Sequence, residues 1–197
     1  MPKTGKVKKG YAISIENVAP FLWYRVGISD KSEVGIRVGL PIYGSGVDYS
    51  RVLYKKKNKW DMLNLAWSLN PNYNLDATYY KFKTKKTDTD FLKSRWLGFR
   101  MMSIQKGITG GTSNRFGFLY GIQSSPRWGM EFGYFHDSSS IPITDIFSSK
   151  WDPFLSENHD RYSKKPTRDE SSGLPSEFSR MTGLSFSLFF DLDAPKK

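Results

Sequence analysis

Histidine, aspartate and serine stand together at one point of the sequence, and these are the residue types of a hydrolytic site. His136 is followed by Asp137 and by the serines Ser138 to Ser140, and the second histidine is His159. A serine nucleophile needs a histidine base within hydrogen-bond reach, and a third group must orient that base. Because a single His-Asp dipeptide specifies little, we predict a hydrogen-bonded structural histidine here. A hydrolase that uses His136 stays open as an alternative.

Other catalytic and metal-binding motifs are absent from the sequence. It has no glycine-rich phosphate loop, no His-Glu metal motif and no EF-hand pattern. It also has no cysteine, which excludes disulfides, thiolate metal sites and cysteine nucleophiles. We therefore predict a non-enzymatic protein with no metal and no cofactor.

The chain is strongly basic, with 30 lysine and arginine residues against 19 acidic residues and a net charge of +11. Such a charge is typical of nucleic-acid-binding proteins, in which basic residues alternate with exposed aromatics on one face. Here the lysines gather instead at the connections between predicted elements, as from Lys55 to Lys59. We therefore predict no nucleic-acid partner.

The elements that must position these groups are strands. Apolar residues alternate with small or polar ones in ten stretches, and this is the period of an extended strand. Short polar connections separate many of them, such as residues 30–32 and the NPN of residues 70–72. No apolar run reaches the roughly 18 residues of a membrane helix. The predicted strands span residues 10–18, 21–29, 33–41, 45–54, 60–69, 73–82, 91–102, 115–123, 127–135 and 183–193.

Each predicted strand has one apolar face and one small or polar face. A soluble barrel turns its apolar side chains inward, whereas a membrane barrel turns them outward to lipid. The polar faces hold arginines among glycines and serines, which favours a polar lumen over a lysine-rich soluble surface. The charged residues predicted to line the lumen are Arg25, Arg37, Asp48, Asp76, Arg100 and Glu131. The residues predicted to face lipid are Leu63, Leu65, Trp67, Trp128, Met130, Phe132, Leu184, Phe186, Leu188 and Phe190.

These patterns predict an all-β protein. Many of the strands approach the roughly ten residues of a tilted membrane strand, and aromatics lie near their ends as in an interfacial girdle. Ten short-linked strands should close on themselves, because closure removes unpaired edges. The predicted fold is an antiparallel meander closed into a transmembrane β-barrel of about ten strands, with eight to twelve compatible. A soluble β-barrel that binds an apolar ligand or a polyanion is the alternative.

Three stretches resemble the hairpins and the last strand of bacterial outer-membrane β-barrel proteins of the porin-like or small-barrel kind: YRVGISDKSEVGIRVGLP, RWGMEFGYFHD and GLSFSLFFDL. The resemblance covers most of the chain, and it lies in the general pattern of hairpins and strands. It implies a place in the outer membrane of a Gram-negative bacterium, with the termini on the periplasmic rim. It also implies a narrow channel or porin-like transporter, or a structural barrel that presents a loop.

Two features depart from that family. Its members commonly end on an aromatic residue of the last strand, whereas here a charged tail follows over residues 191–197. The basic N-terminus lacks the apolar segment of a secretory signal. We therefore expect that, if the protein is exported, this sequence is a mature or truncated form.

One domain is predicted over residues 1–197, with a long irregular loop at about 137–179. Pairing of the inward charges across the lumen is expected, because unpaired buried charges are costly, and a wide pore is therefore not expected. Small solutes remain candidate cargo for a narrow path. The solute and the oligomeric state stay open.

Ten strands place both termini on one rim, and half of the cationic residues fall on that rim. We predict that this basic rim contacts the lipid bilayer through its anionic headgroups, at about 1 kcal/mol per cation. Turn lysines that are merely solvated are the alternative. The residues of the basic rim are Lys3, Lys6, Lys8, Lys9, Lys31, Lys55, Lys56, Lys57, Lys59, Lys83, Lys85, Lys86, Arg127, Lys196 and Lys197.

Overall fold

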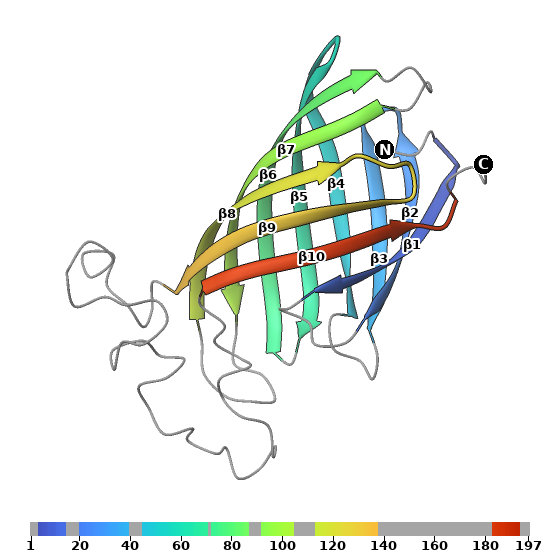
Figure 1. The fold of residues 1–197 in the computed structure, drawn as a ribbon. Helices are drawn as coiled ribbons and strands as arrows, with labels where there is room; N and C mark the ends of the chain where they lie inside the picture. Colours follow the sequence, from blue (N-terminus) through green and yellow to red (C-terminus); the bar gives the residue numbers. More distant parts are fainter. Residues whose placement is uncertain are drawn as a thin grey trace, which may run out of the picture.

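The chain folds into a closed barrel of ten antiparallel strands (Figure 1). Each strand pairs with its neighbours along the sequence, and the first strand pairs with the last. The strands are β1 (Val7–Ser14), β2 (Phe21–Ser29), β3 (Ser32–Gly39), β4 (Ser45–Lys56), β5 (Lys59–Asn70), β6 (Asn72–Lys86), β7 (Leu92–Ile104), β8 (Ser113–Gln123), β9 (Trp128–Asp137) and β10 (Gly183–Asp191). In this computed structural model the described residues are 4–14, 20–39, 45–70, 72–86, 92–104, 113–137 and 183–193.

The predicted all-β fold and the closed antiparallel barrel are confirmed. Each of the ten predicted segments overlaps one strand, and residues 15–18, 40–41 and 91 of these segments lie outside the described residues. β6 and β7 are longer than predicted, because their ladder continues from the Asn74–Ile104 pair to the Lys86–Leu92 pair. The lysine-rich end of β6 is typical of a loop between strands. It forms a strand here because the end of a hairpin that extends into solvent needs no apolar face. Among the described residues, no helix is long and apolar enough to cross a membrane.

Both chain ends lie at the same end of the barrel (Figure 1), as an even number of strands requires. The turns that follow β2, β4 and β8 lie at this end too. In the β4–β5 turn, Lys57 has a φ of 43°, and a two-residue hairpin often needs this left-handed conformation. Thus the basic turns and the described parts of the termini share one rim, which we call the turn rim. The predicted loop at 137–179 lies outside the described residues, except that Asp137 ends β9.

Pairing between β1 and β10 closes the barrel. Their ladder runs from the Gly10–Asp191 pair to the Ser14–Ser187 pair. The rings of Tyr11 and Phe190 stack across this seam, with centroids 4.5 Å apart. Because every strand then has two partners, the barrel has no sheet edge that could pair with another chain.

Candidate functional site: the charged interior of the barrel

An arginine on β2 bridges two carboxylates inside the barrel. The Arg25 Nη1 atom lies 2.8 Å from the Glu33 Oε1 atom, and the Arg25 Nη2 atom lies 3.0 Å from the Asp48 Oδ2 atom. The side chains of Glu33 and Asp48 are 4% and 3% exposed. Charge-assisted hydrogen bonds are short and strong, and either partner alone would be a costly buried charge.

Strand register brings these groups together. Arg25, Gly35 and Asp48 occupy opposite positions on β2, β3 and β4. A Cβ atom added at Gly35 would lie 2.5 Å from Asp48 Oδ1 and 3.2 Å from Arg25 Cγ. Glycine at this position therefore leaves the space through which the Arg25 side chain crosses β3 to reach Asp48.

Neutral donors extend this network to β5. The Asn64 Nδ2 atom donates hydrogen bonds to Asp48 Oδ2 at 3.0 Å and to Ser50 Oγ at 2.9 Å. Ser50 is fully buried. Buried polar groups are nearly always hydrogen-bonded, and here the amide supplies donors to a carboxylate that already holds a guanidinium. The first network thus spans four neighbouring strands.

A second network joins β6, β7 and β9. The Arg100 side chain donates from Nε to Thr78 Oγ1 at 2.9 Å and from Nη2 to the Tyr80 hydroxyl at 3.0 Å. The same Nη2 atom lies 3.8 Å from Glu131 Oε1. The Trp96 Nε1 atom donates to Glu131 Oε2 at 2.7 Å. The Glu131 carboxylate therefore interacts with both the Arg100 guanidinium and the Trp96 indole.

Arg37 and Asp76 complete the six residues predicted to line the lumen, and strand alternation turns both inward. The Arg37 Nε and Nη2 atoms are buried and have no hydrogen-bond partner among the described residues. The carboxylates whose charges act on this guanidinium are Asp48 and Asp76. The structure thus gathers the six charged residues inside the barrel. That they line an open polar path stays a prediction.

Large apolar side chains occupy the interior beside the second network. The rings of Trp60 and Phe82 stack with their centroids 3.8 Å apart and their planes at 3°. The Trp96 ring lies 5.5 Å from the Phe82 ring and 5.7 Å from the Phe189 ring. A barrel of about eight strands is only just wide enough for side chains to fill it, so a cluster of this size takes up much of the interior at its level in a barrel of ten. The interior aromatic cluster comprises Trp60, Met62, Tyr80, Phe82, Trp96, Met102, Leu119, Phe135 and Phe189.

Sequence reasoning does not find Glu33 or the interior aromatic cluster. Glu33 shares the inward face of β3 with Gly35 and Arg37, so strand alternation is the signal that identifies it. No comparable signal marks the cluster. The alternation of residues predicts whether an aromatic ring points inward or outward. The contacts of that ring depend on which strands lie across the barrel.

His136 is the only member of the His-Asp-Ser stretch whose side chain the structure describes. It is fully buried near the end of β9, and its ring lies 5.4 Å from the ring of Phe116 on β8. Ser138 to Ser140 and His159 lie outside the described residues. In the part of the chain that the structure describes, no three histidine or acidic residues are grouped to hold a metal ion.

Nine of the ten residues predicted to face lipid have described side chains, and these nine lie on the outer side of the barrel. Exposed among them are Leu65, Trp67, Trp128 and Phe132. Half-buried are Leu63, Met130, Phe186, Leu188 and Phe190, and the side chain of Leu184 is outside the described part. Further exposed apolar side chains continue this surface around the barrel, including Ile13, Leu22, Ile36, Val47, Leu75, Phe99 and Phe118.

Comparison with known proteins adds little to this geometry. No protein-family model matches the sequence, and no curated protein matches it. A search of solved structures finds the NanC porin, with a TM-score of 0.32 and 9% sequence identity, over 93% of this chain and 97% of the porin chain. At this TM-score the likeness supports neither a fold assignment nor a function.

Proposed function

We propose that this protein is a β-barrel that spans the outer membrane of a Gram-negative bacterium and whose interior is filled by side chains. The supporting observation is the inverted distribution of polarity. Ion pairs such as Arg25–Asp48 lie inside, whereas apolar side chains such as Phe118 are exposed outside. A soluble barrel would require the reverse, because a large exposed apolar surface is unfavourable in water.

The filled interior favours a structural membrane barrel over a wide solute pore. The two charged networks and the interior aromatic cluster occupy the lumen between them. A narrow channel is the second candidate. It is favoured by Arg37, whose buried Nε and Nη2 atoms have no hydrogen-bond partner among the described residues and would suit water or a small anion.

The membrane assignment is tested by asking which tryptophans touch acyl chains. Two variants each keep one of the six tryptophans and replace the other five by phenylalanine. One variant keeps Trp67, which is exposed on the outer side, and the other keeps Trp96, which is buried inside. After reconstitution into vesicles, lipids brominated on their acyl chains should quench Trp67 strongly and Trp96 weakly.

Equal quenching of the two tryptophans, or no quenching of either tryptophan, would contradict the membrane proposal. Extraction provides a second readout on the unaltered chain. A membrane barrel requires detergent for solubility and migrates on a gel as a band that shifts on heating. A soluble barrel that binds an apolar ligand would stay in solution without detergent.

A further inference from the structure

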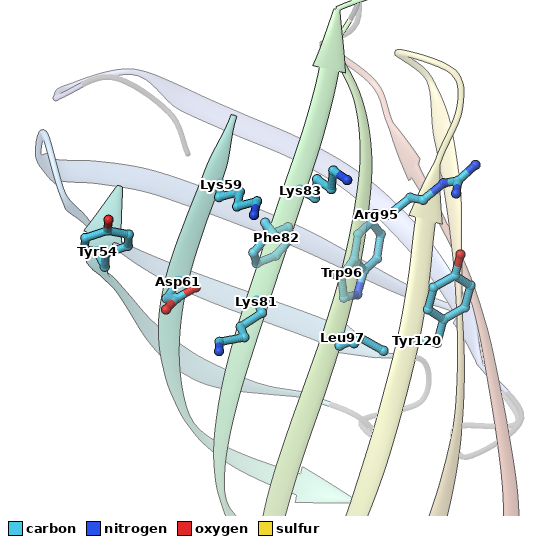
Figure 2. A pocket seen from close by; sticks show the side chains of 10 residues that line it. All are labelled: Tyr54, Lys59, Asp61, Lys81, Phe82, Lys83, Arg95, Trp96, Leu97 and Tyr120. Atoms are coloured by element: carbon cyan, nitrogen blue, oxygen red, sulfur yellow. The ribbon is translucent and has the colours of Figure 1, made fainter. Parts of the chain in front are cut away.

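A shallow groove crosses the outer side of the barrel near the turn rim. It has a volume of about 470 Å³, and its lining residues come from β4 to β8 (Figure 2). Phe82 and Trp96 also line it, although their side chains belong to the interior aromatic cluster, whereas the other lining residues occupy outward positions of their strands. These outward residues are Tyr54, Lys59, Asp61, Lys81, Lys83, Arg95, Leu97 and Tyr120.

Three cations stand side by side in this groove. Lys59, Lys83 and Arg95 occupy directly opposite positions on β5, β6 and β7, and all three are exposed. Like charges that face each other across strands are destabilising, so this row carries an electrostatic cost. None of these three cations forms an ion pair with another described residue.

The acid that lines the groove does not neutralise that row. Asp61 lies one outward position further from the rim than Lys59, and its Oδ2 atom accepts a hydrogen bond from the Tyr79 hydroxyl at 2.8 Å. Lys81, opposite Asp61, adds a fourth cation to the lining. The groove therefore has a net positive charge, and an anion bound there would offset the repulsion.

Below the cations the outer surface becomes apolar. Leu97 lies next to Arg95 among the outward positions of β7 and is 63% exposed. Phe99 follows it, and its ring packs at 5.2 Å from the ring of Phe118, which is 66% exposed. Successive outward positions on a strand are about 7 Å apart, so this apolar track matches the upper part of an acyl chain.

We infer that this groove binds one anionic glycerophospholipid, with its phosphate among Lys59, Lys83 and Arg95 and an acyl chain over Leu97 and Phe118. The inference rests on the proposed membrane function, and it adds a defined lipid site to a generally basic rim. Charge complementarity selects the phosphate, and the apolar track selects a ligand with tails over free phosphate. Tyr54 and Tyr120 also line the groove.

The test compares two triple variants with equal loss of charge. The site variant carries Lys59→Gln, Lys83→Gln and Arg95→Gln. The control variant carries Lys6→Gln, Lys9→Gln and Lys31→Gln, which lie on the same rim by β1 and the β2–β3 turn. β6 and β1 are on opposite sides of the ring of strands, so the control leaves the groove unchanged.

Lipid retention is measured by native mass spectrometry of the full chain in detergent. Phosphatidylglycerol and phosphatidylcholine with the same acyl chains are added in turn, and inorganic phosphate is added as a tail-free competitor. We expect the parent and the control variant to retain one phosphatidylglycerol in preference to phosphatidylcholine. The site variant should bind phosphatidylglycerol at least about tenfold more weakly, because three headgroup contacts are lost.

Three results would overturn the lipid site. These are equal weakening in both triple variants, retention by the site variant that matches the parent, and displacement of the lipid by inorganic phosphate at equal concentration. Each variant is first shown to give the heat-shifted band of the folded barrel. A parent chain that stays soluble without detergent contradicts the proposed membrane function itself, whereas an inserted barrel without lipid preference contradicts only this site.

Discussion

The Arg25 guanidinium and the Asp48 carboxylate are joined at 3.0 Å inside the barrel, across a glycine on the strand between them. Asp48 also accepts a hydrogen bond from Asn64. The carboxylate therefore connects Arg25, which also pairs with Glu33, to Asn64, which also donates to Ser50. Its removal should be strongly destabilising, because Arg25 loses one of its two carboxylates and the buried Arg37 guanidinium loses one of the carboxylates whose charges act on it.

Replacing Asp48 by alanine is expected to lower the free energy of unfolding by about 3 kcal/mol. Urea unfolding of the protein in detergent micelles, followed by circular dichroism, measures this change. Lys8→Ala is the matched control, because Lys8 pairs with Asp191 at 3.6 Å while its side chain is 46% exposed. That variant should lose less than about 1 kcal/mol. Equal losses in the two variants would contradict a stabilising role for the inner network.

The inward direction of these charges can be predicted from the sequence. In a strand, residues two apart share a face, so Arg25, Arg37 and Glu131 are assigned to the polar face from their apolar neighbours alone. Ten alternating segments also predict the number of strands and their antiparallel order. Closure follows from the cost of a free edge, and the β1–β10 ladder confirms it.

Partners across the barrel cannot be predicted in the same way. Whether Arg25 meets Asp48 depends on the register of β2, β3 and β4 and on the space at Gly35. The interior aromatic cluster depends on six strands, β5 to β10, facing a common space. A local pattern holds no information about such distances, so neither contact appears in it.

Gly121 and Trp96 show how the interior accommodates large rings. They occupy opposite positions on β8 and β7, and a Cβ atom at Gly121 would overlap the Trp96 indole. Gly121→Ala is therefore expected to lower the free energy of unfolding by about 1–3 kcal/mol through overpacking. Urea unfolding measures the change. In a Trp96→Ala background the same substitution should cost less than about 1 kcal/mol, and an unchanged cost would show that the ring is not the obstacle.

Removing the stacked pair of the interior aromatic cluster is expected to open the lumen. The double variant Trp60→Ala with Phe82→Ala deletes two rings whose centroids are 3.8 Å apart. Planar-bilayer recordings should then show larger and more frequent conductance steps than the parent protein. The control is Trp67→Ala with Tyr73→Ala, which deletes a stacked pair on the outer side, where the centroids are 6.1 Å apart. Increased conductance in both double variants would point to general loosening of the barrel rather than to a closed interior.

Two outward positions of β8 probe the depth of the proposed bilayer. Phe118 lies in the middle of the apolar outer surface and is 66% exposed. Ile122 is on the same face of the same strand, opposite Arg95 and nearer the turn rim than Phe118. In a soluble protein, arginine at an exposed position such as Phe118 would cost little, because water solvates it.

In a bilayer the two positions should respond differently to arginine. Phe118→Arg is expected to lower the free energy of unfolding by about 2–4 kcal/mol, since the charge must enter the hydrocarbon layer, whereas Ile122→Arg at the interface should cost about 0–1 kcal/mol. Urea unfolding from lipid vesicles, followed by tryptophan fluorescence, measures both values. If Phe118→Arg is as stable as Ile122→Arg, the exposed apolar surface does not lie in a membrane, and the soluble alternative gains support.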